Sequence, residues 1–202
     1  MRITFVLVVA TVFAVVALFA PVLPTFTPGS AFPASSNGPL NILTVTPDFT
    51  PLVQVLTSDS KIVDFETGET PGETGDPVDS AISAAEAFTG TAYNGRVPTI
   101  EGVEGSSLGL PLAISAWSDI TGSTWTTPTA ATGTVDDFGN VFRVMGVQAK
   151  SVLAQSSGDE LLLVPQGSVV SSAFTGQVVF VKNLAEAVAA LCQTPGAVCP
   201  SS

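Results

Sequence analysis

The sequence EGSSLGLPLAISAWSDITG, residues 104–122, decides the fold because it joins a Gly/Ser-rich turn to a helical pattern. We predict a helix over residues 108–120 that begins directly after Gly105, Ser106 and Ser107. Pro111 is compatible with this helix because it falls in the first turn, where the N–H that proline lacks has no intrahelical partner. The segment therefore marks one helix in a chain that alternates between helices and strands.

Short β-branched runs and helical stretches alternate on both sides of this segment. Before it, the pattern predicts a helix at residues 77–88 and strands at 41–48, 51–57, 61–65 and 96–101. After it, the pattern predicts helices at 146–155 and 183–191, the latter capped by Asn183, and strands at 130–135, 140–144, 160–164 and 177–181. This order predicts one α/β-type or α+β domain over residues 40–192, with helices packed on a sheet.

A cluster of carboxylates interrupts the first half of this domain. Residues 59–79 carry seven acidic side chains against the single Lys61. We interpret the cluster as a solvated acidic loop, with calcium binding as the lesser alternative, because it lacks the ligand spacing and central glycine of an EF-hand.

Composition excludes several classes of function. The chain has 202 residues, a formal net charge of −11 and no histidine. Without histidine there is no Ser-His-Asp triad, no Cys-His dyad and no histidine-ligated metal site. Six basic residues cannot form a surface that holds a phosphate backbone, so the composition argues against nucleic-acid binding. Hydrophobic residues make up 46% of the chain, which is enough for a sizeable core.

An apolar segment without charges spans residues 3–23, directly after Met1 and Arg2. Its length matches the roughly 20 residues that a helix needs to cross a bilayer, so the sequence predicts a transmembrane anchor. A cleaved signal sequence is the alternative, with a weak cleavage site at residues 29–31. In either case the positive-inside tendency places the rest of the chain on the extracytoplasmic side, anchored or secreted.

Two short segments flank the predicted domain. Residues 24–39 are rich in Pro, Ser, Thr and Gly without helical or strand periodicity, so we predict an extended linker. Residues 193–202 form a C-terminal tail that contains Cys199, seven positions after Cys192. In an oxidising compartment this spacing predicts a local disulfide that closes a small loop, whereas two cysteines without further ligands make a poor zinc site.

Ser107 and Lys150 carry the candidate chemistry, because a serine nucleophile without histidine needs a lysine or an N-terminal amine as its base. Lys150 lies in a largely apolar helical segment, where partial burial would lower the pKa of its amine. Lys61 and Lys182 have polar neighbours and are interpreted as solvated charges. Ser107 lies at a helix start, where unpaired N–H groups and the helix dipole stabilise a negative oxygen. The sequence has no P-loop pattern.

These residues resemble the proteolytic domain of the Lon proteases. In that family a D-G-P-S-A-G turn carries the nucleophilic serine, a T-G dipeptide opens the next strand, and a G-G-[IL]-x-x-K segment carries the general-base lysine. Here GSSLG at residues 105–109 is similar to the serine turn, Thr132-Gly133 to the dipeptide and GVQAK at residues 146–150 to the lysine segment. The intervals from Ser107 to Thr132 and from Thr132 to Lys150 also agree with the family. The resemblance covers residues 40–192.

The resemblance implies the Lon proteolytic fold, like that of domain 2 of ribosomal protein S5, and a serine endopeptidase with a Ser107–Lys150 dyad. It implies that Thr132 hydrogen-bonds and orients Lys150, and that the oxyanion is held near Gly105, Ser106 and Leu108. Such an enzyme needs no metal or cofactor, and without the AAA+ motor of Lon it would cleave polypeptide substrates without ATP. Lon proteolytic domains form hexameric rings, so a homo-oligomer is a further expectation.

Departures from the family pattern leave alternatives open. Ser106 stands where the family has proline, Leu108 where it has alanine, Thr134 where glutamate is common, and Met145 where it has glycine. EGSSLGLPLA and VKNLAEAVAAL also resemble the Lon-fold module of magnesium-chelatase-related ATPases, which is not a peptidase and generally lacks the lysine. Sugar kinases of the same broad fold have a longer, glycine-richer loop. A catalytically inactive binding or scaffold domain is the alternative to the peptidase.

Overall fold

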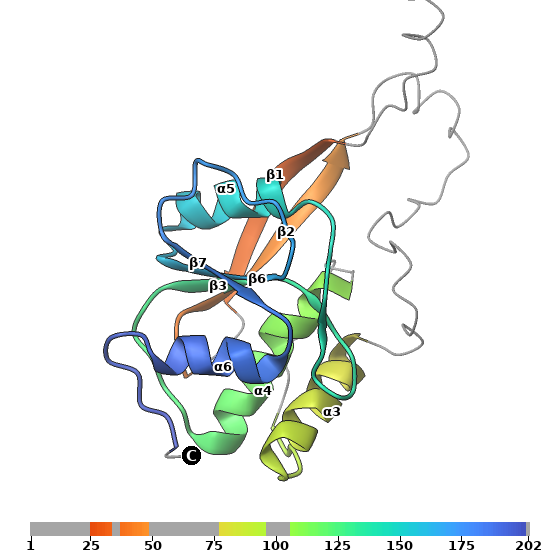
Figure 1. The fold of residues 1–202 in the computed structure, drawn as a ribbon, viewed down its shortest axis with the longest axis vertical. Helices are drawn as coiled ribbons and strands as arrows, with labels where there is room; N and C mark the ends of the chain where they lie inside the picture. Colours follow the sequence, from red (N-terminus) through yellow and green to blue (C-terminus); the bar gives the residue numbers. More distant parts are fainter. Residues whose placement is uncertain (1–24, 34–36, 49–76, 96–105, 201–202) are drawn as a thin grey trace, which may run out of the picture.

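A five-stranded sheet with the strand order β1-β2-β3-β6-β7 organises the molecule (Figure 1). The computed structural model describes residues 25–33, 37–48, 77–95 and 106–200. Strand β1 is antiparallel to β2, and every other neighbouring pair in the sheet is parallel. The strands are β1 (Thr25–Pro33), β2 (Leu40–Asp48), β3 (Thr129–Ala131), β6 (Leu161–Pro165) and β7 (Gln177–Val181). The fold is therefore mixed α/β with a mostly parallel sheet, in agreement with the predicted class.

The central strands are buried on both faces of the sheet. Every residue of β3 and β6 is buried, which explains why LLLVP is a continuous apolar run rather than an alternating one. Leu161 and Leu163 pack into one core cluster, while Leu162 and Val164 pack into the other, as the period of two in a strand requires. The edge strand β7 is mostly exposed or half-buried.

Helices cover both faces of the sheet (Figure 1). Helix α5 (Val147–Ser157) packs on one face, and α3 (Pro77–Thr89), α4 (Gly109–Thr121) and α6 (Leu184–Cys192) pack on the other. A 3₁₀ turn, η1 (Ser106–Leu108), precedes α4, and Pro111 lies in the first turn of α4 as predicted. Asn183 caps α6, because its side chain accepts a hydrogen bond of 2.9 Å from Glu186 N–H.

The two helical connections between parallel neighbours have opposite hands. The connection from β2 to β3 places α3 and α4 on one face of the sheet, and the connection from β3 to β6 places α5 on the other face. Both connections move the chain to the next strand in the same direction across the sheet. Right-handed crossovers are the rule, so one of these two is left-handed. As a consequence, the first turns of α4 and α5 lie on opposite faces at the same end of β3.

Two predictions are wrong: the linker at residues 24–39 and the single strand at residues 130–135. Residues 25–33, assigned to the linker of residues 24–39, form strand β1 of the sheet. Proline is tolerated there because β1 is an edge strand whose register shifts between Pro28 and Ala31. The single strand predicted at 130–135 is divided into β3 and β4 (Thr134–Val135) by Thr132 and Gly133. Strand β4 pairs with β5 (Val141–Phe142) in a separate two-stranded sheet.

Several predictions lie outside the described residues. They include Gly105, the apolar segment 3–23, the strands at 51–57, 61–65 and 96–101, and most of the acidic segment 59–79. Within the residues that the structure describes, no helix has the length and apolar character needed to span a membrane.

A disulfide closes the tail, as its spacing predicts. Cys192 at the end of α6 is bonded to Cys199, with a Cα–Cα distance of 5.8 Å. The returning chain pairs with the segment after α4, because Thr124 N–H donates to Val198 O at 2.9 Å and Val198 N–H donates to Thr124 O at 2.8 Å. The tail is therefore fixed against the body of the domain at two points.

Candidate active site

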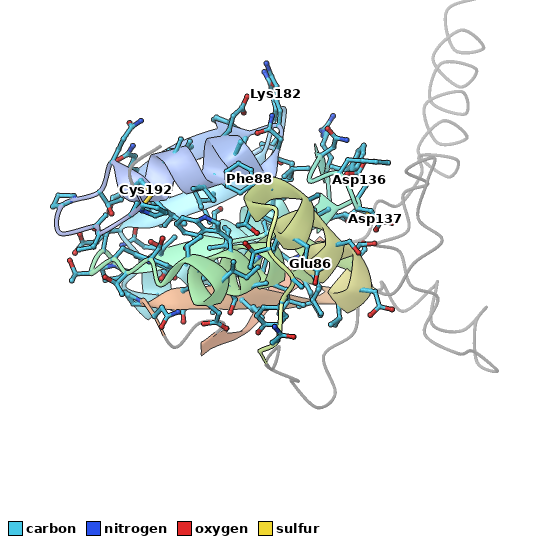
Figure 2. The ribbon with its side chains drawn as sticks, turned by 90° about the horizontal axis from the view of Figure 1, so that it is seen from below. Glu86, Phe88, Asp136, Asp137, Lys182 and Cys192 are labelled. Carbon is cyan, nitrogen blue, oxygen red and sulfur yellow. A yellow bond between two sulfur atoms is a disulfide. The ribbon has the colours of Figure 1, made fainter. Side chains whose placement is uncertain are left out.

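Lys150 is the most deeply buried charged side chain among the residues that the structure describes. It lies in the first turns of α5, and only 1% of its surface is exposed. Its Nζ donates a hydrogen bond of 3.2 Å to Thr132 Oγ1, which is itself fully buried. Lys182, in contrast, projects from the surface (Figure 2). The structure thus places the two lysines in the environments that the sequence predicts.

The dipeptide Thr132-Gly133 directly follows β3 and lies between the lysine and the serine turn of the candidate site. Thr132 N–H donates to Leu163 O at 3.1 Å and continues the sheet beyond β3. Gly133 has a φ of 154°, a conformation that favours glycine, and a Cβ there would lie 3.0 Å from Val141 Cγ1. The N–H and C=O of Gly133 form hydrogen bonds with the start of α4 instead of with β6. Strand β3 ends here because its ladder of hydrogen bonds with β6 does not continue.

Ser107 is joined to this dipeptide through the main chain. Gly133 N–H donates to Ser107 O at 3.1 Å, and Leu110 N–H donates to Gly133 O at 2.8 Å. The Ser107 side chain is largely buried, with 7% of its surface exposed, while Ser106 and Leu108 are half-buried. The start of α4 is therefore fixed to the carboxyl end of β3 by two reciprocal hydrogen bonds.

Gly109 permits this close approach. A Cβ at Gly109 would lie 2.7 Å from the backbone N of Val135 and 3.3 Å from Gly133 O. Both neighbours are backbone atoms, so neither can move aside without shifting a strand. The second glycine of the GSSLG motif thus has a steric role, whereas the first, Gly105, lies outside the described residues.

The structure brings Ser107, Thr132 and Lys150 to one end of the sheet. Lys150 reaches Thr132 from the face covered by α5, and Ser107 reaches Gly133 from the face covered by α4. Lys150 bonds to Thr132 as the resemblance implies, but the described residues contain no hydrogen bond between Lys150 Nζ and Ser107 Oγ. Lys150 Nζ and the Ser107 main chain are therefore connected through the single dipeptide Thr132-Gly133.

A buried carboxylate that the sequence did not single out lies at the other end of the sheet. Asp159 follows α5 and is 3% exposed; its Oδ1 accepts a 2.9 Å hydrogen bond from Asn41 Nδ2, and its Oδ2 has no partner. Burial raises the pKa of Asp159 to about 6, and the bond from Asn41 opposes this shift. The sequence signal was weak, because Asp159 follows Gly158 as many solvated turn residues do.

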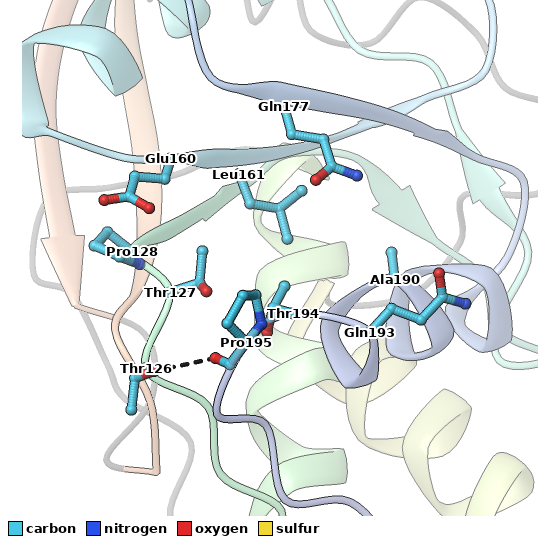
Figure 3. A pocket seen from close by; sticks show the side chains of 10 residues that line it. All are labelled: Thr126, Thr127, Pro128, Glu160, Leu161, Gln177, Ala190, Gln193, Thr194 and Pro195. Carbon is cyan, nitrogen blue, oxygen red and sulfur yellow. Dashed lines mark hydrogen bonds between the residues drawn. The ribbon is translucent and has the colours of Figure 1, made fainter.

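A cleft at this same amino end was also missed. It has a volume of about 470 Å³ and is lined by residues from the segments before β3 and β6, the start of β7, the end of α6 and the tail (Figure 3). No motif links these segments, so nothing in the sequence predicted that they meet.

The fold and site define a mixed α/β domain with a buried lysine, a threonine and a serine turn at the carboxyl end of its parallel sheet. Comparison of the chain with protein-family models and with curated proteins finds no match. The resemblance to Lon proteases therefore stays a prediction, and the functional assignment depends on the motifs and the geometry.

Proposed function

We propose that the protein is a Lon-like serine endopeptidase that hydrolyses peptide bonds with Ser107 as nucleophile and Lys150 as general base. The observation that carries this proposal is the burial of Lys150 with its Nζ on Thr132 Oγ1, beside the turn that holds Ser107. A lysine that serves only solubility stays in water, whereas removal from water favours the neutral amine that a general base requires.

The reaction proceeds by acyl transfer. Neutral Lys150 takes the proton from Ser107 Oγ as that oxygen attacks the carbonyl carbon of the scissile peptide bond, and the ammonium then protonates the leaving amine. Water hydrolyses the acyl-enzyme with Lys150 again acting as base. The first step requires Oγ to come within about 3 Å of Nζ, so the Ser107 side chain turns toward Lys150 when substrate binds. Thr132 is a positioning residue that holds Nζ in place.

In this proposal the oxyanion donors are those that the resemblance implies, at the beginning of the serine turn. Leu110 N–H is already bonded to Gly133 O, so it is not available to a substrate. The earlier N–H groups, from Gly105, Ser106 and Leu108, are the proposed donors, and the helix start adds its partial positive charge. No metal, nucleotide or other cofactor takes part in this scheme.

The setting of the enzyme is part of the same proposal. The apolar segment 3–23 would anchor the chain in a membrane, or be cleaved as a signal, with the domain on the extracytoplasmic side. The Cys192–Cys199 disulfide supports an oxidising compartment. A homo-oligomer, with a hexameric ring as its form, follows from the resemblance alone, and analytical ultracentrifugation of the full chain tests it.

The deciding experiment measures cleavage of an unfolded, fluorescein-labelled protein by the full chain in detergent, with a metal chelator and without ATP. Ser107→Ala and Lys150→Met should each lower kcat at least 100-fold. Ser156→Ala and Lys182→Met are matched controls, since both side chains are exposed and neither belongs to the site motifs. Cleavage that persists in both site variants would refute the dyad.

The alternative is a catalytically inactive binding or scaffold domain of the same architecture. It is favoured by the missing hydrogen bond between Ser107 Oγ and Lys150 Nζ within the described residues, and by Ser106 and Leu108 at positions where the family has proline and alanine. Failure of the wild-type chain to cleave any unfolded substrate, at every pH at which the domain stays folded, supports this alternative.

A further inference from the structure

We propose that the cleft at the amino ends of β3, β6 and β7 binds a lysine or arginine side chain of a polypeptide. The cleft is separate from the proposed peptidase site, because Thr127 and Pro128 precede β3 whereas Thr132 follows it. The inference concerns binding, so its test does not depend on whether the chain cleaves peptides.

The cleft combines accessible apolar side chains with polar ones. Its accessible apolar side chains are Pro128, Ala190 and Pro195, whereas the lining residue Leu161 is only 1% exposed (Figure 3). Five residues bring hydrogen-bonding side chains to the cleft, namely Thr126, Thr127, Thr194, Gln177 and Gln193. With about 470 Å³, the cleft falls within the range of small-ligand sites.

One charge distinguishes the cleft. Glu160 carries the only charged side chain among its lining residues, and no basic residue lines it. The carboxylate lies at the end of the cleft beside Pro128 (Figure 3). Since the chain has a net charge of −11, the field around the cleft attracts cations and repels anionic ligands.

Lysine and arginine side chains match this arrangement. Each has a flexible apolar stem that packs along hydrophobic surface and a cationic head that stays hydrated near a carboxylate. In the cleft the stem would lie on Pro128 and Pro195, with the head beside Glu160. The amides of Gln177 and Gln193 are then placed to bond the backbone on either side of the basic residue.

The neighbouring edge strand favours a polypeptide over a free amine. Gln177 opens β7, which stands last in the strand order, so its outer edge has no partner strand among the described residues. The backbone groups along such an edge can pair with an extended chain. A bound segment that enters from this edge would bring its side chain over the cleft.

The tail disulfide builds one wall of the cleft. Gln193, Thr194 and Pro195 belong to the loop that the Cys192–Cys199 bond closes, and Thr126 Oγ1 donates a 3.2 Å hydrogen bond to Pro195 O across it. Gly196 approaches Thr126 so closely that a Cβ would lie 2.8 Å from Thr126 Oγ1. The site therefore requires an intact disulfide.

The test is an NMR titration of the full ¹⁵N-labelled chain in detergent with the capped peptide acetyl-Gly-Ala-Lys-Ala-Gly-amide. Shifts should concentrate on the Gln177 and Gln193 side-chain amides, with a dissociation constant on the order of 1 mM, as expected for one exposed ion pair and a short apolar stem. Replacing the lysine by norleucine, or Glu160 by Gln, should weaken binding about three- to fivefold. Asp137→Asn is the control, since it removes the same charge from an exposed turn outside the cleft.

Further measurements test the role of the disulfide, the need for a positive charge and the identity of the occupant as a polypeptide. The Cys192→Ser/Cys199→Ser double variant, checked for an intact core by its Ile114 and Leu163 methyl shifts, should lose the titration shifts. Equal binding of the norleucine peptide, or an unchanged affinity of Glu160→Gln, would overturn the cationic site. If 1,5-diaminopentane binds as tightly as the lysine peptide, the occupant is a free amine and the polypeptide assignment is wrong.

Discussion

The two ends of the parallel sheet are built in different ways. At the carboxyl end, Lys150, Thr132 and Ser107 are buried and are fixed by hydrogen bonds between α4, α5 and the end of β3. At the amino end, the cleft beside Glu160 is open, and a disulfide-closed tail forms part of its wall. A buried amine needs rigid support to hold its geometry, whereas a recognition site for a solvated cation needs only complementary walls. The sheet thus separates a site suited to chemistry from one suited to binding.

The position of the candidate dyad follows a general property of parallel sheets. Ligand sites lie outside the carboxyl ends of the strands, where connections diverge to opposite faces. Here α4 and α5 diverge in this way, because the two crossovers have opposite hands. The dipeptide Thr132-Gly133 lies between their first turns and contacts both. If the two ends have these separate roles, substitutions at one end should leave the function of the other intact.

Lys150→Met should abolish peptidase activity at the carboxyl end and leave the fold intact. Loss of a general base lowers the rate by about 100- to 10,000-fold. The free energy of unfolding should stay the same or rise, because methionine fills a similar volume without a buried amine. Assays of labelled unfolded protein and chemical denaturation measure the two effects. A large loss of stability with residual activity would mean that Lys150 is structural.

Gly109→Ala should destabilise the domain by about 3 kcal/mol, since the new Cβ meets backbone atoms of β4 at 2.7 Å. It should also lower activity, because it separates the serine turn from Gly133. The matched control is Gly158→Ala at the amino end, where a Cβ meets nothing within 4 Å and only the φ of 80° is unfavourable. That variant should lose about 1 kcal/mol and keep its activity. Urea denaturation and the peptidase assay distinguish the pair.

Removal of the disulfide should lower the stability of the domain without changing the peptidase site at the carboxyl end. The Cys192→Ser/Cys199→Ser double variant should unfold with about 2–3 kcal/mol less free energy, because the short loop is no longer closed in the unfolded chain. Peptidase activity measured well below the unfolding temperature should remain within about twofold of wild type, since surface changes far from a site add independently. A collapse of activity in this variant would show that the two ends are coupled.

Asp159 should give the amino end a pH dependence of its own. Its folded-state pKa of about 6 lies above the ordinary value of 3.8, so the folded protein keeps a proton that the unfolded chain releases. Its contribution to stability is therefore present at low pH and is lost as the pH rises through about 6. Asp159→Asn should gain about 2 kcal/mol relative to wild type between pH 4.5 and 7, since one pKa unit corresponds to about 1.4 kcal/mol. Thermal unfolding at both pH values, with Asp137→Asn as control, measures this gain; equal differences at the two pH values would contradict it.

Elements with a strong local pattern were predictable from the sequence. Strand β7 has the predicted limits, and β6 and α6 agree to within one residue, because LLLVP is a continuous apolar run and Asn183 is a strong N-cap. Strand β1 was missed because its prolines argue against a strand, and only the edge position and the register shift accommodate them. The break after β3 was missed because it depends on hydrogen bonds between Gly133 and a helix distant in sequence.

The candidate dyad was more predictable than the cleft. Lys150 stands out because it interrupts an apolar helix, and its bond to Thr132 agrees with the spacing of the motifs. The cleft depends on five separate segments that meet only in three dimensions, and its residues are ordinary threonines, glutamines and prolines. Asp159 likewise gained its unusual pKa from burial against Asn41, a contact across 118 positions of sequence.

The strand order has a consequence for how the chain folds during synthesis. Its sequence order, β1-β2-β3-β6-β7, means that each strand leaving the ribosome can add to the edge formed by the strand before it. Among the described strands of this sheet, none has to be inserted between two that are already paired. The last additions are β7, α6 and the disulfide, so the tail closes only after the rest of the sheet is in place.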